Sequence, residues 1–282
     1  MTIAVTGATG QLGGHIIESL LARGAQPANI VAIVRDSAKA APLAAKGVTV
    51  RVASYEDESA LVSALTGVER LAFVSGSEMG QRVAQHTNII NAAKTAGVGF
   101  IAYTSLLNLD TSELGLADEH RATEALLAES GIPQARLRNG WYWENYASAI
   151  DSGKAAGKLF GAAGAARVSG AARRDYAEAA AVVMLGDGHA GKVYELAGAP
   201  ALSYPGIAAE VAKVIGTEVE YVNQSVEQYQ ATLESFGLPA PMAAAFAGME
   251  PAIEKGGLYS ESTDLQDLIG RPSTPLAEAL AS

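Results

Sequence analysis

A run of three glycines near the N-terminus constrains the fold of this chain more than any other segment. Gly7, Gly10 and Gly13 form a Gly-x-x-Gly-x-x-Gly pattern directly after the short apolar stretch Ile3–Thr6. An amphipathic helical pattern over residues 11–23 follows it. In dinucleotide-binding domains the first glycine permits a tight turn, the second admits a pyrophosphate and the third packs helix against strand. The run therefore predicts a Rossmann-type nucleotide loop whose contacts are Gly7, Thr9, Gly10, Gln11, Leu12 and Gly13.

Short apolar runs alternate with helical patterns up to about residue 138. The expected strands are Ile3–Thr6, Ile30–Val34, Val48–Val52, Arg70–Val74, Gly99–Tyr103 and Ala135–Arg138. Helical periodicity fills the intervals at 11–23, 38–46, 57–65, 80–96 and 116–130. Short buried strands separated by helices form right-handed βαβ units, and therefore a parallel sheet. The predicted fold class is α/β, with a doubly wound parallel Rossmann sheet and a smaller C-terminal α/β lobe.

The pattern changes beyond Asn139. Residues 151–172 are rich in Gly and Ala and are predicted to be a loop region with one short strand at 158–160. A helix beginning near Asp175 and a strand at Lys192–Leu196 follow, and further elements are expected at 204–215, 218–222, 226–236 and 240–254. We predict an NAD(P)-binding domain over 1–150 and a substrate-binding lobe over 151–282, with the elements at 176–196 returning to the first domain.

The tip of the second predicted strand indicates which dinucleotide binds. An NAD site places an acidic residue there to bind the ribose 2′-hydroxyl, whereas an NADP site places an arginine. Arg35 follows the strand Ile30–Val34 directly, and Asp36 comes next. Because a guanidinium pairs well with a 2′-phosphate, NADP(H) is the predicted cofactor, with NAD(H) as the alternative. Ser75 and Gly76, which follow the fourth strand, are expected to pass under the adenosine ribose.

Composition excludes several classes of function. The chain has no cysteine, so disulfides, thiolate nucleophiles and cysteine-ligated metals are absent, and its four histidines lack metal-ligand spacing. A formal charge of −10 disfavours nucleic acid as a ligand. No signal-like segment or apolar run of about 18 residues occurs, so no membrane association and a cytoplasmic location are expected. The residues do not fix the oligomeric state, and a homo-oligomer stays open.

Several motifs along the chain resemble one known family. They are TGATGQLGG, IVRD, YTSLLN, GLADEH, LRNGWYWENY and LIGRP. Together they resemble the NmrA-like branch of the atypical short-chain dehydrogenase/reductases, and within it the quinone oxidoreductase 2 and triphenylmethane reductase group. The resemblance covers essentially the whole chain. It implies a Rossmann core with a small C-terminal lobe and a substrate held between them, in a branch that contains both reductases and redox-sensing regulators.

The predicted catalytic residues are Tyr103, Ser105 and His120. Standard short-chain dehydrogenases use a Ser or Thr after the fifth strand and a Tyr-x-x-x-Lys motif on the next helix. By resemblance His120 takes the position of the lysine and Leu116 that of the tyrosine, so this helix carries no tyrosine acid. His120 is expected to hold the ribose, relay a proton near neutral pH, or serve as a hydrogen-bonded structural histidine. Thr104 and Asn139 complete the predicted cofactor contacts.

Aromatic residues concentrate directly after the sixth strand. Trp141, Tyr142 and Asn145 are the predicted substrate contacts, and Tyr142 and Asn145 are expected to face the pocket together. A quinone needs little acid catalysis because its reduced oxygen is a stabilised phenolate, and positioning then supplies most of the rate. We therefore expect an NADPH-preferring reductase of quinones or similar planar electrophiles. The alternatives are a reductase of triarylmethane dyes and a non-catalytic redox sensor.

Overall fold

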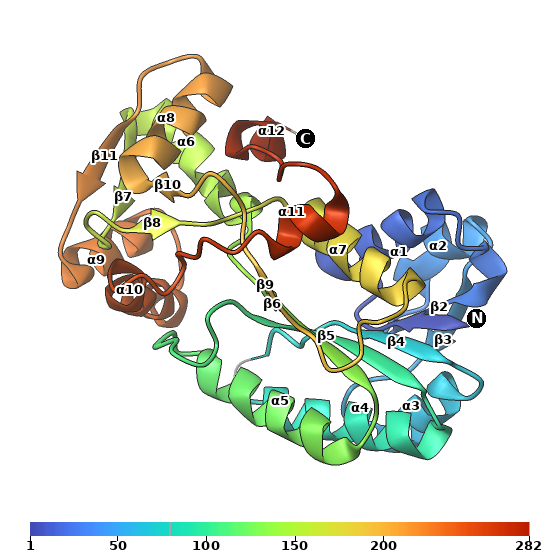
Figure 1. The fold of residues 1–282 in the computed structure, drawn as a ribbon. Coiled ribbons are helices and arrows are strands. Elements are labelled where there is room, and N and C mark those ends of the chain that lie inside the picture. The colour runs from blue at the N-terminus through green and yellow to red at the C-terminus, as the bar shows by residue number, and fades with distance from the viewer. Residues whose placement is uncertain (79, 282) are drawn as a thin grey trace.

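Seven strands of the chain pair into one parallel sheet (Figure 1) in the computed structural model, which describes residues 1–78 and 80–281. The order across the sheet is β3-β2-β1-β4-β5-β6-β9. The strands are β1 (Ile3–Val5), β2 (Ile30–Val34), β3 (Thr49–Val52), β4 (Arg70–Phe73), β5 (Phe100–Leu106), β6 (Gln134–Asn139) and β9 (Val193–Leu196). The predicted doubly wound α/β fold is therefore confirmed.

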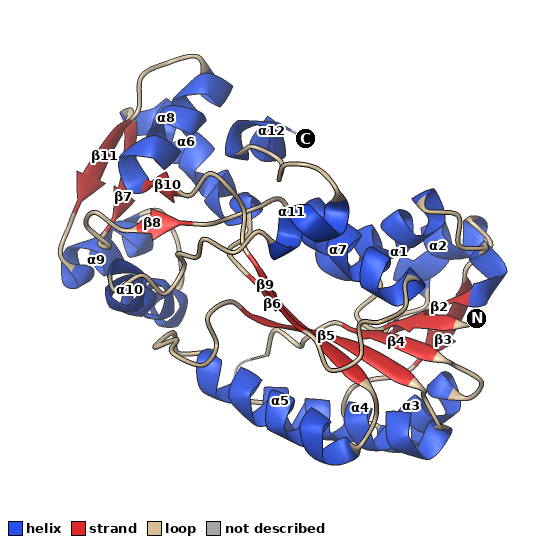
Figure 2. Ribbon diagram, in the orientation of Figure 1, coloured by secondary structure: helices blue, strands red, loops and turns tan. Residues whose placement is uncertain are grey.

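Helices cover both faces of the sheet (Figure 2). One face carries α1 (Gln11–Ala22), α2 (Ala41–Ala45), α7 (Arg173–Leu185) and α11 (Asp264–Ile269); the other carries α3 (Glu58–Leu65), α4 (Arg82–Ala96) and α5 (Ala117–Ser130). Each face has its own apolar core, which contains Ile16 and Leu20 on the α1 side and Leu61 and Ile89 on the α4 side. The strand order reverses at β1 and β4, and such a reversal leaves a crevice at the carboxyl ends of the strands.

The C-terminal part of the chain builds a second, smaller unit. Its elements are α6 (Ala147–Ala156), β7 (Lys158–Gly161), β8 (Arg167–Val168), β10 (Leu202–Ser203), α8 (Tyr204–Ile215), β11 (Glu220–Asn223), α9 (Val226–Ser235), α10 (Ala240–Glu254) and α12 (Leu276–Ala281). β7 pairs in parallel with β11, and β8 pairs antiparallel with β10. Between these segments the chain returns to the large sheet, where α7 packs on α1 and β9 extends β6. The domain boundary at residue 150 stays a prediction.

The structure corrects the loop predicted over 151–172. Helix α6 continues to Ala156, although Gly153 lowers the helix propensity of this segment. A Cβ at Gly153 would lie 3.1 Å from Ile215 Cδ1 and 3.3 Å from Val219 Cγ2. Close packing against α8 therefore requires the glycine that made the segment look like a loop. Helices α11 and α12 were not predicted either. Among the described helices, none is long and apolar enough to cross a membrane.

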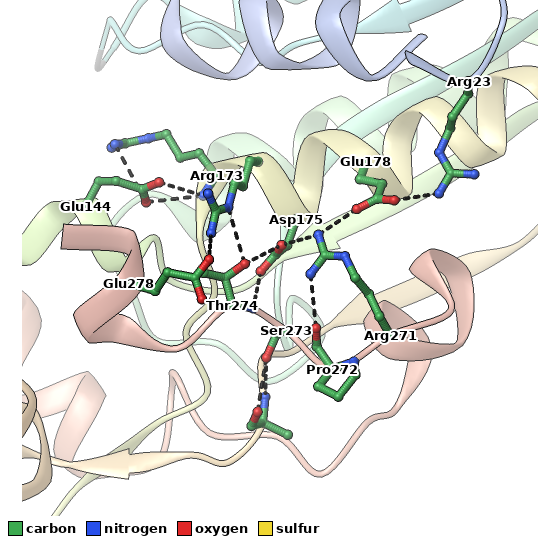
Figure 3. A network of polar contacts seen from close by, with 12 residues as sticks. Arg23, Glu144, Arg173, Asp175, Glu178, Arg271, Pro272, Ser273, Thr274 and Glu278 are labelled. Atoms are coloured by element: carbon green, nitrogen blue, oxygen red, sulfur yellow. Dashed lines mark hydrogen bonds and ion pairs between the residues drawn. The ribbon is translucent and has the colours of Figure 1, made fainter. Parts of the chain in front are cut away.

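A buried polar network fastens the last segment of the chain to α7 (Figure 3). Asp175 is fully buried and accepts hydrogen bonds from the Thr274 backbone N–H (2.6 Å) and hydroxyl (2.9 Å). Arg271 donates to Asp175 at 2.7 Å and to Glu178 at 2.6 Å, and Glu178 also accepts from Arg23, the residue after α1, at 2.6 Å. The Glu178 carboxylate thus links α7 to the end of α1 and to Arg271. The buried charge of Asp175 is compensated by its three hydrogen bonds from Arg271 and Thr274.

Candidate active site

The glycine loop lies at the carboxyl end of β1, where backbone contacts leave no room for side chains. Gly7 has a φ of 58°, a conformation that favours glycine. A Cβ on Gly13 would lie 2.3 Å from the Gly7 carbonyl oxygen, and one on Gly10 would lie 3.1 Å from the same atom. The third glycine therefore lets α1 begin in direct contact with the loop.

A cleft of about 350 Å³ opens over this loop, in the crevice between β1 and β4. Among the described residues no side chain caps α1 at Gly10, so the N–H groups of its first turn are available to an anionic ligand. The cleft is lined by many of the predicted cofactor contacts: Gly7, Thr9, Gly10, Gln11, Leu12, Gly13, Arg35, Ser75 and Gly76. The structure thus brings together residues from three separate loops at one sheet edge.

Two cations stand at the end of the cleft beyond β2. Arg35 and Lys39 both line it. Nη1 of Arg35 donates to Glu78 Oε1 at 2.9 Å, and Gln85 Nε2 donates to the other oxygen of Glu78 at 3.0 Å. Both side chains of the Arg35–Glu78 pair are solvent-exposed, so the pair is weak and a bound anion can replace it.

The sequence analysis did not predict several lining residues. Lys39 could have been predicted from the sequence, because it is a second cation shortly after the predicted strand Ile30–Val34. Nothing in the local sequence marks Tyr55 as a cleft residue. Its hydroxyl donates to the Val74 carbonyl oxygen at 2.9 Å, and burial raises the pKa of this hydroxyl to about 12. The other unpredicted residues in the cleft wall are Ala53, Ser54, Ser77, Glu78 and Gln85, together with Ile33, Val34 and Val74.

Groups beneath the cleft hold the loop that follows β4. The Ser75 N–H donates to Thr104 Oγ1, and the Gly76 N–H donates to His86 Nε2, each at 2.9 Å. Arg82 Nε donates to the Gly76 carbonyl oxygen at 3.0 Å. Thr104 thus supports the cleft from behind and is not part of its wall. Because burial lowers the pKa of His86 to about 3, this histidine is neutral and its Nε2 can accept the backbone hydrogen bond.

Tyr103 and Ser105, two of the predicted catalytic residues, are buried. Side chains alternate along a strand, and both residues point to the face of β5 that α5 covers. Tyr103 is 0% exposed, and its hydroxyl lies 2.7 Å from His120 Nδ1. Ser105 Oγ donates to the buried Glu124 at 2.6 Å. The predicted strand stopped at Tyr103, whereas β5 continues to Leu106, so Tyr103 lies in the middle of the strand. Neither side chain lines the cleft, and their catalytic roles stay predictions.

His120 is buried with Tyr103, which matches its expectation as a hydrogen-bonded structural histidine. Burial and then the charge of Arg82 lower the pKa of His120 to about 3. The ring is therefore neutral at pH 7, with one N–H donor and one acceptor nitrogen. A role in relaying a proton stays a prediction. A ribose contact stays a prediction, although His120 is not among the residues lining the cleft.

A second cavity of about 340 Å³ lies in the C-terminal unit. Trp141 and Asn145, two of the predicted substrate contacts, line it. The rest of its wall is mainly aromatic and aliphatic and comes from α6, α9, α10 and neighbouring segments: Tyr146, Leu159, Phe160, Tyr204, Tyr229, Leu233, Phe236, Phe246, Met249 and Ile253. Such a wall suits a flat apolar ligand.

Tyr142 and Asn139 are not among the residues that line this cavity. The Tyr142 ring packs edge-on against Tyr176 with centroids 5.3 Å apart, beneath the Arg173 guanidinium at 4.7 Å. Its hydroxyl accepts from Asn139 Nδ2 at 3.3 Å. Of the predicted pair, Asn145 lines this cavity and Tyr142 does not, and their contact with a substrate stays a prediction. Asn139 Oδ1 is buried without a hydrogen-bond partner among the described residues.

A carboxyl group that sequence reasoning missed also lines the aromatic cavity. Glu250 is buried, and it accepts from the Ala162 N–H at 2.7 Å and from the Tyr204 hydroxyl at 3.2 Å. Burial raises the pKa of this carboxyl. The residue sits within the predicted helix 240–254, where nothing in the local sequence sets it apart from a surface glutamate.

Comparison with known proteins agrees with this architecture. The model of the NmrA-like family matches residues 1–276. The chain belongs to the NmrA-like family. This NmrA-like protein is 54% identical to quinone oxidoreductase 2 of Escherichia coli (strain K12) over 279 residues, which cover 99% of this chain and 97% of that protein.

Solved structures are similar to this NmrA-like protein over nearly its whole length. The NADPH complex of the E. coli NADPH-dependent quinone oxidoreductase superposes with a TM-score of 0.95 at 54% identity, covering 99% of each chain. The NADP(H) complex of the Citrobacter sp. triphenylmethane reductase superposes with a TM-score of 0.94 at 38% identity, covering 100% of each chain. Both similarities extend across the glycine-loop cleft and the aromatic cavity.

Proposed function

We propose that this NmrA-like protein is an NADPH-dependent oxidoreductase that reduces quinones and similar planar electrophiles. The observation that carries the proposal is the pairing of a phosphate-binding cleft with an aromatic cavity beyond the end of β6. The high identity to an NADPH-dependent quinone oxidoreductase supports it further. Trp141 and Asn145 are the proposed substrate contacts.

The residues of the cleft fit a bound NADPH. Gly13 lets α1 begin against the loop, since a Cβ there would lie 2.3 Å from the Gly7 carbonyl oxygen, and the pyrophosphate would then lie over Gly10 at the N-terminal end of the helix. Arg35 and Lys39 would pair with the 2′-phosphate, while Ser75 and Gly76 would support the adenosine ribose. We assign Asn139 to the nicotinamide end, because its buried amide oxygen lacks a partner in the described chain.

The chain's own groups act mainly by positioning. Bound NADPH supplies the hydride. Tyr103 and Ser105 are buried and engaged with His120 and Glu124, so neither is placed to act as an exposed acid. A quinone tolerates this arrangement, because hydride addition converts its carbonyl oxygen into a stabilised phenolate, which then takes a proton from water. Holding a flat acceptor in an apolar cavity is then the main contribution of the protein.

Reduction of triarylmethane dyes is a second candidate activity. Asp151 and Glu250 line the aromatic cavity, and among its described lining residues none is Lys or Arg. A cationic aromatic ligand is favoured by such walls. The 38% identity to a triphenylmethane reductase adds support for this substrate class.

Steady-state NADPH oxidation tests the proposal directly. The assay compares 1,4-benzoquinone, a cationic triarylmethane dye and a reaction without acceptor. We expect rapid, saturable oxidation with the quinone and little without acceptor. Turnover of the dye alone would move the protein to the second candidate. Tight NADPH binding without turnover of any acceptor would instead favour a redox sensor and overturn the proposed activity.

A further inference from the structure

Asn145 holds a fixed hydrogen bond at the wall of the aromatic cavity. The residue follows β6 in a short 3-10 segment and lines the cavity. Its amide oxygen accepts a hydrogen bond from Arg173 Nη2 at 2.9 Å. Arg173 opens helix α7, more than 25 residues further along the chain, so this contact depends on the tertiary fold.

The chemistry of Arg173 determines how the Asn145 amide is oriented. A guanidinium carries only hydrogen-bond donors, so the amide atom that faces it must be the oxygen. The amide nitrogen is then the atom left to a molecule in the cavity. Asn145 is solvent-exposed, and no hydrogen bond of its Nδ2 is found among the described residues. The wall therefore presents an N–H donor at this point.

Arg173 is itself held from several sides. Its backbone N–H donates to Glu144 Oε1 at 2.9 Å, and its Nη1 lies 4.0 Å from Glu144 Oε2 (Figure 3). The guanidinium also lies over the Tyr142 ring, 4.7 Å from its centroid. The side chain is only 17% exposed. A planar cation fixed by an acid and an aromatic ring can hold the amide in one orientation, which a lysine cannot do as well.

We propose that Arg173 is a positioning residue that turns Asn145 into a hydrogen-bond donor for the carbonyl oxygen of the acceptor. The proposal rests on the proposed quinone reductase activity and adds a preference within it. Acceptors whose ring carries a carbonyl oxygen gain this contact, whereas acceptors without such an oxygen, such as triarylmethane cations, do not. The contact is made by the substrate in the ground state and therefore acts mainly on KM.

Two substitutions separate this role from a structural one. Asn145→Asp keeps the shape and the partner of Arg173 but removes the N–H donor. Arg173→Met keeps the apolar stem over Tyr142 but releases the amide. For both variants we expect the KM for benzoquinone to rise, by about tenfold for Asn145→Asp and by about threefold to fivefold for Arg173→Met, the scale of one hydrogen bond. The kcat, the NADPH affinity and the KM for a cationic dye should not worsen.

Arg174→Met is the matched control, because Arg174 pairs with Thr274 and Glu278 and makes no contact with Asn145. It should leave the KM for benzoquinone unchanged. The inference is overturned if the quinone and dye KM values rise together, or if the benzoquinone KM of Asn145→Asp equals that of the wild type. A wild-type protein that oxidises NADPH with none of the acceptors would instead overturn the proposed function, so the two failures are distinguishable.

Discussion

The two cavities are built in opposite ways. The glycine-loop cleft is shaped by backbone: it uses consecutive loop residues, the ends of β2, β3 and β4 and a helix N-terminus, all within the first 85 residues. The aromatic cavity is shaped by side chains gathered from 141–160, Tyr204 and 229–253. A backbone site needs particular residues at particular spacings, whereas a side-chain site needs only bulk and polarity in the right places. We therefore expect the glycine-loop cleft to tolerate few substitutions and the aromatic cavity to tolerate more.

Their charges differ as well. Arg35 and Lys39 stand in the cleft, which suits phosphate groups, whereas Asp151 and Glu250 stand in the cavity wall. We therefore expect the cleft to favour an anionic cofactor and the cavity to favour an uncharged or cationic acceptor. We expect substitutions in the cleft to change binding sharply and those around the buried α5 cluster to change stability more than turnover.

Gly13→Ala should have the largest effect. The added methyl group would lie 2.3 Å from the Gly7 carbonyl oxygen, so α1 must move away from the loop. We expect NADPH affinity to fall by at least about 100-fold, because the helix end and the loop no longer share one anion site. Gly14→Ala is the control, since its methyl group would lie 3.7 Å from the Ala8 oxygen, an ordinary contact. Equal NADPH dissociation constants for the two variants, measured by calorimetry, would contradict the loop assignment.

Arg35→Ala should have the next largest effect, and only on the phosphorylated cofactor. Losing a charged hydrogen-bonding partner costs about 1.5–3 kcal/mol, or roughly 10- to 150-fold in NADPH affinity. NADH lacks the 2′-phosphate, so its affinity should barely change and it serves as the internal control. Parallel losses for NADPH and NADH in the same titrations would remove Arg35 from the 2′-phosphate and leave Lys39 as the cation of this site.

The sequence predicts the glycine-loop cleft better than the aromatic cavity. Glycine spacing and strand periodicity are local signals, and they located the parallel sheet and the loop residues of the cleft correctly. Tyr103 was placed at a strand end because the apolar run stops there, whereas β5 continues to Leu106 and buries this side chain against α5. Glu250 and the Arg173–Asn145 contact were beyond reach, because each depends on segments that meet only after folding. Gly153 misled the helix prediction for the same reason.

The buried His120 should make stability depend on pH. Its pKa falls from the ordinary value of 6.5 to about 3 in the folded protein. Between these values the unfolded chain binds the extra proton, so stability decreases as the pH falls through 6.5. At pH 5.5 the loss from one such histidine is about 1.5 kcal/mol relative to pH 7.5.

Urea unfolding at the two pH values checks this linkage. His120→Gln should reduce the loss of stability between pH 7.5 and 5.5 by about that amount, and His15→Gln, at an exposed position on α1, should not. The kcat profile should show no His120-dependent break between about pH 5.5 and 7.5. A break in that range that disappears in His120→Gln would show that His120 takes part in the reaction.

The smallest effect is expected from Tyr103→Phe, which tests whether the buried cluster stands apart from both cavities. The substitution removes only the hydroxyl that lies 2.7 Å from His120 Nδ1 and keeps the ring packed against Phe73 and His86. The lost hydrogen bond should lower the free energy of unfolding by about 1 kcal/mol. Because this hydroxyl contacts neither cavity, kcat with benzoquinone should stay within about twofold of the wild type, and the NADPH affinity should not change. General acid catalysis is worth about 100-fold or more. A loss of that size with an unchanged NADPH affinity would show that Tyr103 reaches the substrate after all, and the cavity near Trp141 would then have to extend to β5.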